Sequence, residues 1–179
     1  AAMHAINQKK FGKTFYHLGP ARDISVFEKV KDNRTDLQTC DFILCTGLFD
    51  DHNENLNFYK DLFEKNIKKK MICTNPDLIV DRGNTREFCA GSVAMVFEKM
   101  GGEVVYFGKP YPEVYNQSIY NKNKKILSIG DNLNTDIKGA NLLNYDSLII
   151  SNGIHKDEIK EKGIEKVAKS YEAICNYIQ

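Results

Sequence analysis

Short apolar runs alternate along this chain with longer stretches in which apolar residues recur every three or four positions. The short runs, such as Ile126–Ile129, are typical of buried strands, and several of them end at a glycine. The longer stretches have the period of a helix, most clearly at Val93, Val96, Phe97 and Met100. Strands and helices that take turns along a chain predict an α/β fold.

The pattern predicts the position of each element. Strands are expected at residues 13–18, 40–45, 71–73, 104–107, 126–129 and 147–150. Helices are expected at the start of the chain and at 24–30, 56–67, 93–100, 112–120, 137–143 and 167–178. Residues 80–88 are expected to form a loop or a hairpin. Gly101 and Gly102 end a helix, and we place a domain boundary there, between residues 1–102 and 103–179.

Candidate chemistry begins at the strand that ends in Gly130. Asp131 follows the strand directly, Asn134 or Thr135 is expected to cap the next helix, and Asp136 falls in its first turn. Open α/β sheets bind ligands at such strand-to-helix turns. Two carboxylates on one turn repel each other unless a cation lies between them, so a hard divalent cation is one interpretation. The other is that Asp131 forms the turn and Asp136 suits the helix start.

A lysine stands at a second strand end. The expected strand at 104–107 leads into Gly108, Lys109 and Pro110. Lys109 is therefore placed to neutralise a phosphate or to orient an acidic nucleophile, although most lysines are solvated surface residues. The Gly-Lys-Pro sequence followed by a strand and Gly-Asp-x-x-x-x-Asp is a more specific signal than either part alone.

These motifs resemble those of a known family. Residues 108–110 (Gly-Lys-Pro) and 130–137 (Gly-Asp-Asn-Leu-Asn-Thr-Asp-Ile) are similar to the third and fourth motifs of the haloacid-dehalogenase-like (HAD) hydrolases. Residues 73–77 (Cys-Thr-Asn-Pro-Asp) resemble the Thr-Asn-Pro-Asp segment of their NagD-like subgroup, which comprises sugar-phosphate and nucleotide phosphatases. The resemblance runs along nearly the whole chain, in the family's order.

The resemblance implies a fold and a set of roles. Residues 1–102 would be an α/β cap domain, and residues 103–179 the C-terminal half of a Rossmann-like parallel-sheet core. Asp131 would bind Mg2+, and Asp136 would support the water shell of the metal. Lys109 would hold the nucleophile and the phosphoryl oxygens. Asn75 and Asp77 would lie near a small phosphorylated substrate.

One part of the family pattern has no match. Family members carry Asp-x-Asp after the first core strand, and no Asp-x-Asp occurs here; Asp50 and Asp51 are adjacent. The family's second motif has no clear counterpart either. We therefore expect a fragment that is inactive alone and that exposes strand edges, with homodimerisation as a hypothesis. The alternative is a non-catalytic binding or assembly module of the same fold. A phospho-receiver and a dinucleotide-binding domain fit less well, because Lys109 precedes the acidic turn and GxGxxG is absent.

Composition narrows the remaining classes. The formal net charge of +1 gives no electrostatic reason to expect nucleic acid as a partner. No apolar run approaches the length of a membrane helix, so no membrane partner is expected. The five cysteines lack CxxC spacing, and reduced thiols in the cytoplasm fit them best. Residues 50–57 are expected to be a polar loop, and His155 a loop histidine. Arg82 and Arg86 are expected at the surface.

Overall fold

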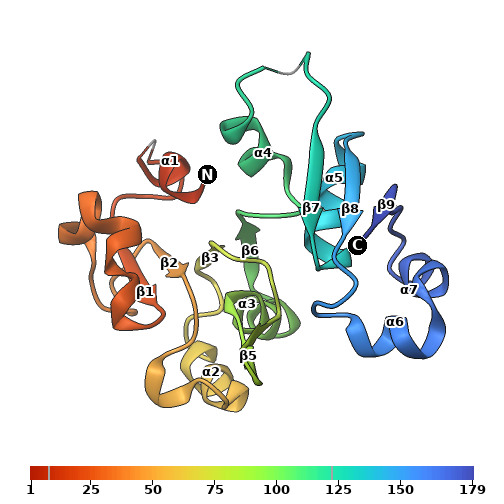
Figure 1. Ribbon diagram of the computed structural model, residues 1–179. Helices are drawn as coiled ribbons and strands as arrows, with labels where there is room; N and C mark the ends of the chain where they lie inside the picture. The colour runs from red at the N-terminus through yellow and green to blue at the C-terminus, as the bar shows by residue number, and fades with distance from the viewer. Residues whose placement is uncertain (8, 122) are drawn as a thin grey trace. The chain divides into compact units, whose positions relative to one another are not determined.

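A computed structural model of the protein describes residues 1–7, 9–121 and 123–179, and it confirms the α/β class (Figure 1). The chain divides into two compact units, Ala1–Gly108 and Lys109–Gln179. Each unit is described on its own below.

The first unit alternates strands with helical segments, as the apolar pattern predicts. Its elements are α1 (Ala2–Asn7), β1 (Phe15–Leu18), η1 (Ala21–Asn33), β2 (Phe42–Cys45), η2 (Asp50–His52), α2 (Leu56–Phe63), β3 (Lys70–Cys73), β4 (Ile79–Arg82), β5 (Thr85–Phe88), α3 (Ala90–Lys99) and β6 (Glu103–Tyr106).

Four of these strands form one parallel sheet in the order β1-β2-β3-β6. The register aligns the ends of the strands, since Leu18 lies opposite Cys45, Cys45 opposite Cys73, and Cys73 opposite Tyr106. The carboxyl ends of all four strands therefore meet at one edge of the sheet, and the loops that follow them lie together there.

Both faces of this sheet are covered, as a parallel sheet requires. Alternate residues such as Ile43 and Met71 pack with the side chains of α2 and α3 on one face. Phe42, Leu44 and Ile72 pack with α1 and η1 on the other. The strands consequently read as continuous apolar runs, which is why the sequence pattern located them.

In the first unit, the predicted hairpin is confirmed and one predicted helix is wrong. Residues 80–88 do form a hairpin, in which β4 pairs antiparallel with β5. The helix expected at 24–30 is wrong as a regular α-helix, because η1 is a chain of 3-10 turns with non-helical backbone at Phe27 and Val30. Phe27 is fully buried against Phe15, and this tertiary contact holds the irregular backbone in place of an α-helical turn.

The last strand of the first unit explains where the chain divides. β6 pairs with β3, so residues 103–106 complete the sheet of the first unit, and the division into compact units comes after Gly108. The sequence places its boundary at Gly102, where α3 has just ended and Gly101 adopts a φ of +93°. The assignment of the two parts as cap and core stays a prediction.

The second unit carries three parallel strands in the order β7-β8-β9. Its elements are α4 (Pro112–Ser118), β7 (Leu127–Gly130), η3 (Leu133–Ile137), α5 (Lys138–Leu142), β8 (Asp146–Ile149), α6 (Lys156–Lys162), α7 (Ile164–Ser170) and β9 (Tyr177–Ile178). Its core contains Leu133, Ile137, Ile149 and Val167, which joins the face of the sheet to η3 and α7.

The end of the chain departs from the predicted helix. The helix expected at 167–178 is wrong beyond Ser170, where α7 ends, and Ile178 lies in β9. Side-chain amides hold the segment extended: Asn141 exchanges two hydrogen bonds with the backbone of Ile174, at 2.8 and 2.9 Å. Asn176 accepts another from the backbone N–H of Ser147. These contacts join residues about 30 apart, so local periodicity could not reveal them.

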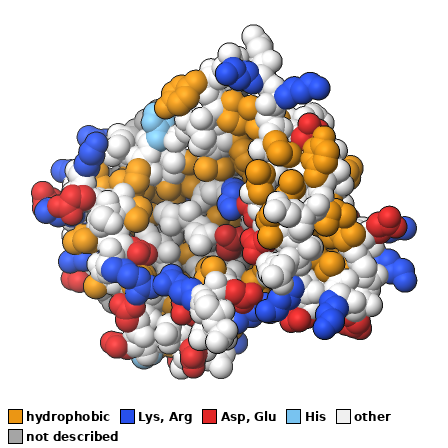
Figure 2. Space-filling view, in the orientation of Figure 1, with side chains coloured by type: hydrophobic (Ala, Val, Ile, Leu, Met, Phe, Trp, Pro, Cys, Tyr) orange, Lys and Arg blue, Asp and Glu red, His pale blue; other side chains and the backbone are white. Residues whose placement is uncertain are grey.

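Lys and Arg side chains are interspersed with Asp and Glu on the face of the molecule shown in Figure 2, in keeping with the small net charge. Within the described residues, no helix has the length and apolar character needed to cross a bilayer.

Candidate functional site

The turn that follows β7 carries both of the predicted acids. Asp131 comes directly after the strand, and Asp136 lies in η3, which begins at Leu133 and runs into α5. The helix cap is Asn132, whose side chain accepts a hydrogen bond from the backbone N–H of Asn134. The expectation of a cap at Asn134 or Thr135 is therefore wrong by two or three residues. We call residues 131–136 the acidic turn.

Lys109 forms an ion pair with the second acid of this turn. Its Nζ lies 2.5 Å from Oδ1 of Asp136. The Asp136 side chain is 8% exposed and that of Lys109 is 45% exposed, so the carboxylate is buried and the ammonium partly reaches solvent. Oδ2 of Asp136 accepts a hydrogen bond from the backbone N–H of Asn132 at 3.2 Å. A buried carboxylate needs such partners, and Asp136 has them on both oxygens.

Glycine at position 130 makes room for this carboxylate. A Cβ atom at Gly130 would lie 2.1 Å from Cγ of Asp136, which is closer than any real contact. The glycine that ends β7 in the sequence pattern is thus needed for the close approach of Asp136 to the strand end, and not only for the turn.

Asp131 is held from the loop after β8. Its Oδ2 accepts a hydrogen bond from the backbone N–H of Ile154 at 3.1 Å. A Cβ atom at Gly153 would lie 2.2 Å from Cβ of Asp131, so a glycine there also permits a close approach. Because β7 and β8 are parallel neighbours, the loops after them lie side by side and this contact can form.

The same loop supplies a buried histidine. His155 is 8% exposed, and its Nε2 accepts a hydrogen bond from the backbone N–H of Leu133 at 3.2 Å. Its Nδ1 lies 3.3 Å from Oε2 of Glu158. His155 lies in the loop after β8, as expected, but it is more than an ordinary loop residue, because both ring nitrogens are engaged and one of them contacts the acidic turn.

Three successive backbone amides of the acidic turn are directed at side chains. The N–H of Asn132 donates to Asp136, that of Leu133 to His155, and that of Asn134 to the side chain of Asn132. A helix start can bind a phosphate only through free amides. These three amides are occupied, so the turn presents its carboxylates rather than an anion cradle.

The donor set of the acidic turn suits a hard cation held by few protein atoms. Both oxygens of Asp136 are engaged, whereas for Asp131 only Oδ2 has a hydrogen-bond partner within the described residues. No group of three or more His, Cys, Asp or Glu side chains in residues 1–7, 9–121 and 123–179 is arranged to hold a metal. Mg2+ commonly binds through one or two carboxylates and keeps several waters, so Asp131 with a hydrated ion fits.

Asn75 and Asp77 belong to the first unit, in the loop after β3. Oδ1 of Asn75 accepts a hydrogen bond from the backbone N–H of Asp77 at 3.1 Å, which closes a tight turn around Pro76. Gly91 in α3 packs against this turn, since a Cβ atom there would lie 2.2 Å from the carbonyl oxygen of Pro76. The turn is therefore fixed on the first turn of α3.

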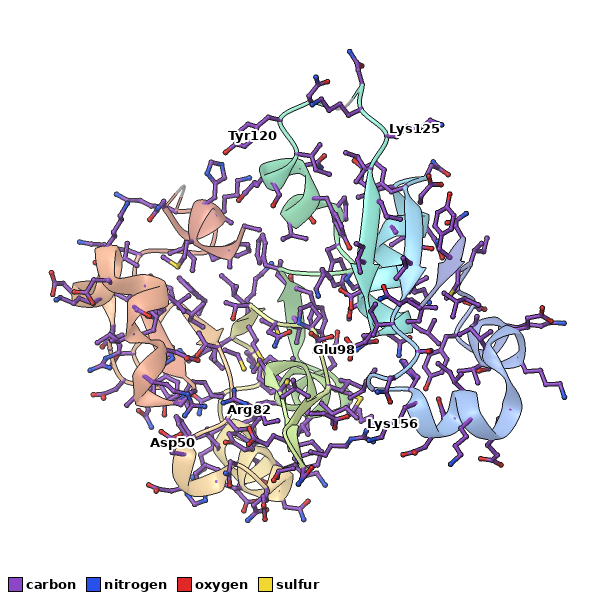
Figure 3. The ribbon with its side chains drawn as sticks, in the orientation of Figure 1. Asp50, Arg82, Glu98, Tyr120, Lys125 and Lys156 are labelled. Atoms are coloured by element: carbon purple, nitrogen blue, oxygen red, sulfur yellow. The ribbon has the colours of Figure 1, made fainter. Side chains whose placement is uncertain are left out.

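Asn75 also lines a cavity of about 530 Å³ in the first unit. Loops at the carboxyl ends of β1, β2 and β3 contribute to it together with the β4–β5 hairpin. Its charged lining consists of two ion pairs, Arg22 with Asp50 at 2.7 Å and Arg82 with Glu87 at 3.2 Å, and of Asp23. Figure 3 labels Asp50 and Arg82. The position, at the carboxyl ends of parallel strands, is one where α/β sheets bind ligands.

Comparison with known proteins supports the family resemblance that the sequence motifs indicate. Residues 106–176 match the sequence model of the HAD-hydrolase-like family. A haloacid-dehalogenase-like hydrolase from Brucella suis 1330 is 28% identical, with a TM-score of 0.75 over 86% of this chain. The chain has the fold of the HAD-like hydrolases. The resemblance that its motifs carry is thereby confirmed.

Two further solved structures extend the similarity over almost the whole chain. A p-nitrophenyl phosphatase from Archaeoglobus fulgidus is 12% identical, with a TM-score of 0.67. The superposition covers 99% of this chain and 67% of the phosphatase chain. A HAD-superfamily protein from Cytophaga hutchinsonii ATCC 33406, described as a possible sugar phosphatase, is 22% identical with a TM-score of 0.66, covering 98% and 66%. No curated protein matches. The chain spans 64% of the length of the Brucella structure.

Proposed function

We propose that this HAD-like chain is part of a Mg2+-dependent phosphatase that hydrolyses phosphate monoesters through an aspartyl-phosphate. The observation that carries the proposal is the arrangement of Lys109, Asp131 and Asp136 in the second unit. The ion pair between Lys109 and Asp136 lies next to Asp131, which directly follows β7. A cationic group and a free carboxylate oxygen are thus presented together, as phosphoryl transfer requires.

Each residue has a distinct role in this proposal. Asp131 would bind Mg2+ directly, through the carboxylate oxygen that Ile154 does not occupy. Asp136 would hold the ammonium group of Lys109 in place and contact the water shell of the metal. Lys109 would neutralise charge on the phosphoryl oxygens and orient an attacking carboxylate. When bound, Mg2+ supplies further positive charge to the transferring phosphoryl group.

The first unit would select the organic part of the substrate. The cavity that Asn75 lines is polar, and its two arginines are already paired with carboxylates. We propose that this unit selects the leaving group of a small phosphorylated substrate, with Asn75 and Asp77 as substrate-binding residues. The charged lining carries two arginines and three acids, Asp23, Asp50 and Glu87, so a strongly anionic leaving group is disfavoured.

The attacking group is not among the motifs of these 179 residues. Because no Asp-x-Asp occurs, we propose that the chain alone binds Mg2+ but does not turn over substrate. The five cysteines are all free thiols, which fits a reducing compartment such as the cytoplasm. Self-association is part of the same proposal, since β7 is a sheet edge and exposes Leu127 and Ile129.

The metal site is tested by titrating the chain with Mg2+ in a calorimeter, and with Mn2+ as a paramagnetic probe in NMR. Asp131→Asn should abolish binding and should remove the broadening of signals around residue 131. Asp146→Asn is the matched control, because Asp146 is an exposed acid at the start of β8. Equal binding by the Asp131→Asn variant and the unsubstituted chain would contradict the proposed metal role.

A non-catalytic binding or assembly module of the same fold is the second candidate, and the lack of Asp-x-Asp favours it. The two are distinguished with p-nitrophenyl phosphate as substrate. The phosphatase proposal expects Mg2+-dependent hydrolysis when the chain is joined to a HAD core segment that carries Asp-x-Asp, and its loss with Asp131→Asn. A joined protein that folds and binds Mg2+ but shows no hydrolysis supports the module.

A further inference from the structure

The loop after β8 holds the acidic turn at two points. The backbone N–H of Ile154 donates to Oδ2 of Asp131, and Nε2 of His155 accepts from the backbone N–H of Leu133. The first contact fixes a carboxylate. The second fixes the backbone between Asp131 and Asp136, and it is made by a side chain to which the motifs give no role.

The buried position of Leu133 makes the second contact necessary. Leu133 is fully buried, at 0% exposure, so water cannot serve as the acceptor for its N–H group. A buried backbone donor without an acceptor costs about 1–3 kcal/mol. The chain places the nitrogen of an imidazole there, and the turn is thereby held in the one conformation that satisfies this N–H.

Neighbouring groups fix the tautomer of the ring. Because Nε2 accepts from Leu133, the ring proton of neutral His155 lies on Nδ1, facing Oε2 of Glu158 at 3.3 Å. The hydroxyl of Tyr171 donates to the same oxygen at 3.2 Å, and its ring packs edge-to-face on the imidazole with centroids 4.7 Å apart. The hydrogen bond from His155 is the main cause that lowers the pKa of Glu158.

This arrangement leaves the imidazole no part in proton transfer. Both ring nitrogens are committed to groups of the protein, and the ring is 8% exposed. A general acid or base needs a nitrogen within reach of the substrate. His155 is thus suited to orient other groups, as outer residues of metal sites do when they fix the ligands.

We propose that His155 is a positioning residue for the acidic turn: as a neutral imidazole oriented by Glu158, it fixes the Leu133 amide and thereby the separation and direction of the Asp131 and Asp136 carboxylates. The effect of this positioning role on Mg2+ binding rests on the proposed function. Its effect on the shape of the turn does not rest on the proposed function.

The hydrogen bond itself is tested in the unsubstituted chain by NMR. An N–H···N bond gives a measurable coupling between the two nitrogens, so we expect a coupling between the Leu133 amide nitrogen and Nε2 of His155. The nitrogen shifts of the ring should show the proton on Nδ1. Absence of the coupling, or a proton on Nε2, would overturn the proposal, and neither result depends on a variant that folds.

Two substitutions then test what the bond does. His155→Phe keeps an aromatic ring against Tyr171 but offers no acceptor, and His155→Gln offers an amide oxygen. With Phe, the amide signals of Asn132 and Ile154 should shift and Mg2+ affinity should fall about tenfold, the range seen when outer partners of metal ligands are lost. With Gln, the amide signals and the Mg2+ affinity should both return most of the way to their values in the unsubstituted chain. His52→Phe, in the first unit, is the matched control.

The outcomes separate this inference from the proposed function. Failure of the unsubstituted chain to bind Mg2+ would count against the metal site alone. The positioning role would then stand or fall on the coupling and on the Asn132 and Ile154 signals. If those signals stay in place in a folded His155→Phe variant, or if Mg2+ binds that variant as tightly as the unsubstituted chain, the positioning role is refuted.

Discussion

The Nζ atom of Lys109 lies 2.5 Å from Oδ1 of Asp136, although 27 residues separate them in the sequence. Lys109 follows β6 and begins the second unit, and Asp136 lies on the first turns after β7. The pair joins two motifs that the sequence shows only as separate strand ends. It also gives Asp136 a structural role that is distinct from that of Asp131.

Loss of either partner of this pair should destabilise the second unit. Lys109→Gln leaves the buried carboxylate of Asp136 without its cation, and we expect a loss of about 1–2 kcal/mol in the free energy of unfolding, since the lysine is partly exposed. Asp136→Asn should cost a similar amount. Urea unfolding at pH 7 measures both.

A double-mutant cycle isolates the contact. The two losses should not add, and a coupling energy of about 1 kcal/mol is expected for groups in direct contact. A coupling of zero within error would show that the ion pair contributes nothing to stability.

Gly130→Ala should disturb the acidic turn because its Cβ would meet the carboxyl group of Asp136, 2.1 Å from Cγ. Overpacking of this kind costs about 1–3 kcal/mol in the free energy of unfolding. The clash is with a single side chain, so the cost should shrink in an Asp136→Ala background. If Gly130→Ala is equally destabilising in both backgrounds, the requirement for glycine lies in the backbone instead.

Asp41 should make the free energy of unfolding of the first unit depend on pH. Its Oδ2 accepts from the N–H of Thr14 at 2.8 Å, the N–H of Lys13 at 2.7 Å and the hydroxyl of Thr14 at 3.1 Å. These hydrogen bonds, those of Thr14 and Lys13 first, lower the pKa of Asp41 in the folded protein. The charged form is therefore favoured by folding.

The sign of this dependence follows from the lowered pKa. The stabilisation by Asp41 is fully present above the pKa of the unfolded chain, and it is lost as the pH falls through the lower pKa of the folded state. Asp41→Asn should thus be destabilising at pH 7, and the difference from the unsubstituted chain should shrink in acid. A difference that stays constant from pH 7 to acid would contradict this account.

Cys89 should react slowly with alkylating reagents near neutral pH. Burial is the main cause that raises the pKa of its thiol to about 11, with Asp77 next. Only the thiolate is nucleophilic, so the alkylation rate at this position should climb from pH 8 toward pH 11. Mass spectrometry locates the modified residue, and Cys89→Ser should remove that signal. A rate that levels off near pH 9 would contradict the raised pKa.

Local sequence determined the kinds of element and most of their positions. The strands of the first unit are continuous apolar runs because both faces of a parallel sheet are buried, and this needs no knowledge of their partners. The α3 helix and its end just before Gly101 follow from apolar spacing and glycine in the same way. The prediction of helix at 171–178 was wrong because contacts from Asn141 and Ser147 hold that segment extended.

The candidate site, too, was determined partly by local sequence and partly by tertiary contacts. The sequence by itself determined that Lys109, Asp131 and Asp136 stand at strand ends, because glycine and the end of an apolar run mark such positions locally. Only the tertiary structure decided that Asp136 takes the lysine, that Ile154 holds Asp131, and that His155 accepts from Leu133. The contacts of Ile154 and His155 arise because parallel pairing sets the loops after β7 and β8 beside each other. The partner of Lys109 is 27 residues away in the sequence, and no local pattern encodes either kind of proximity.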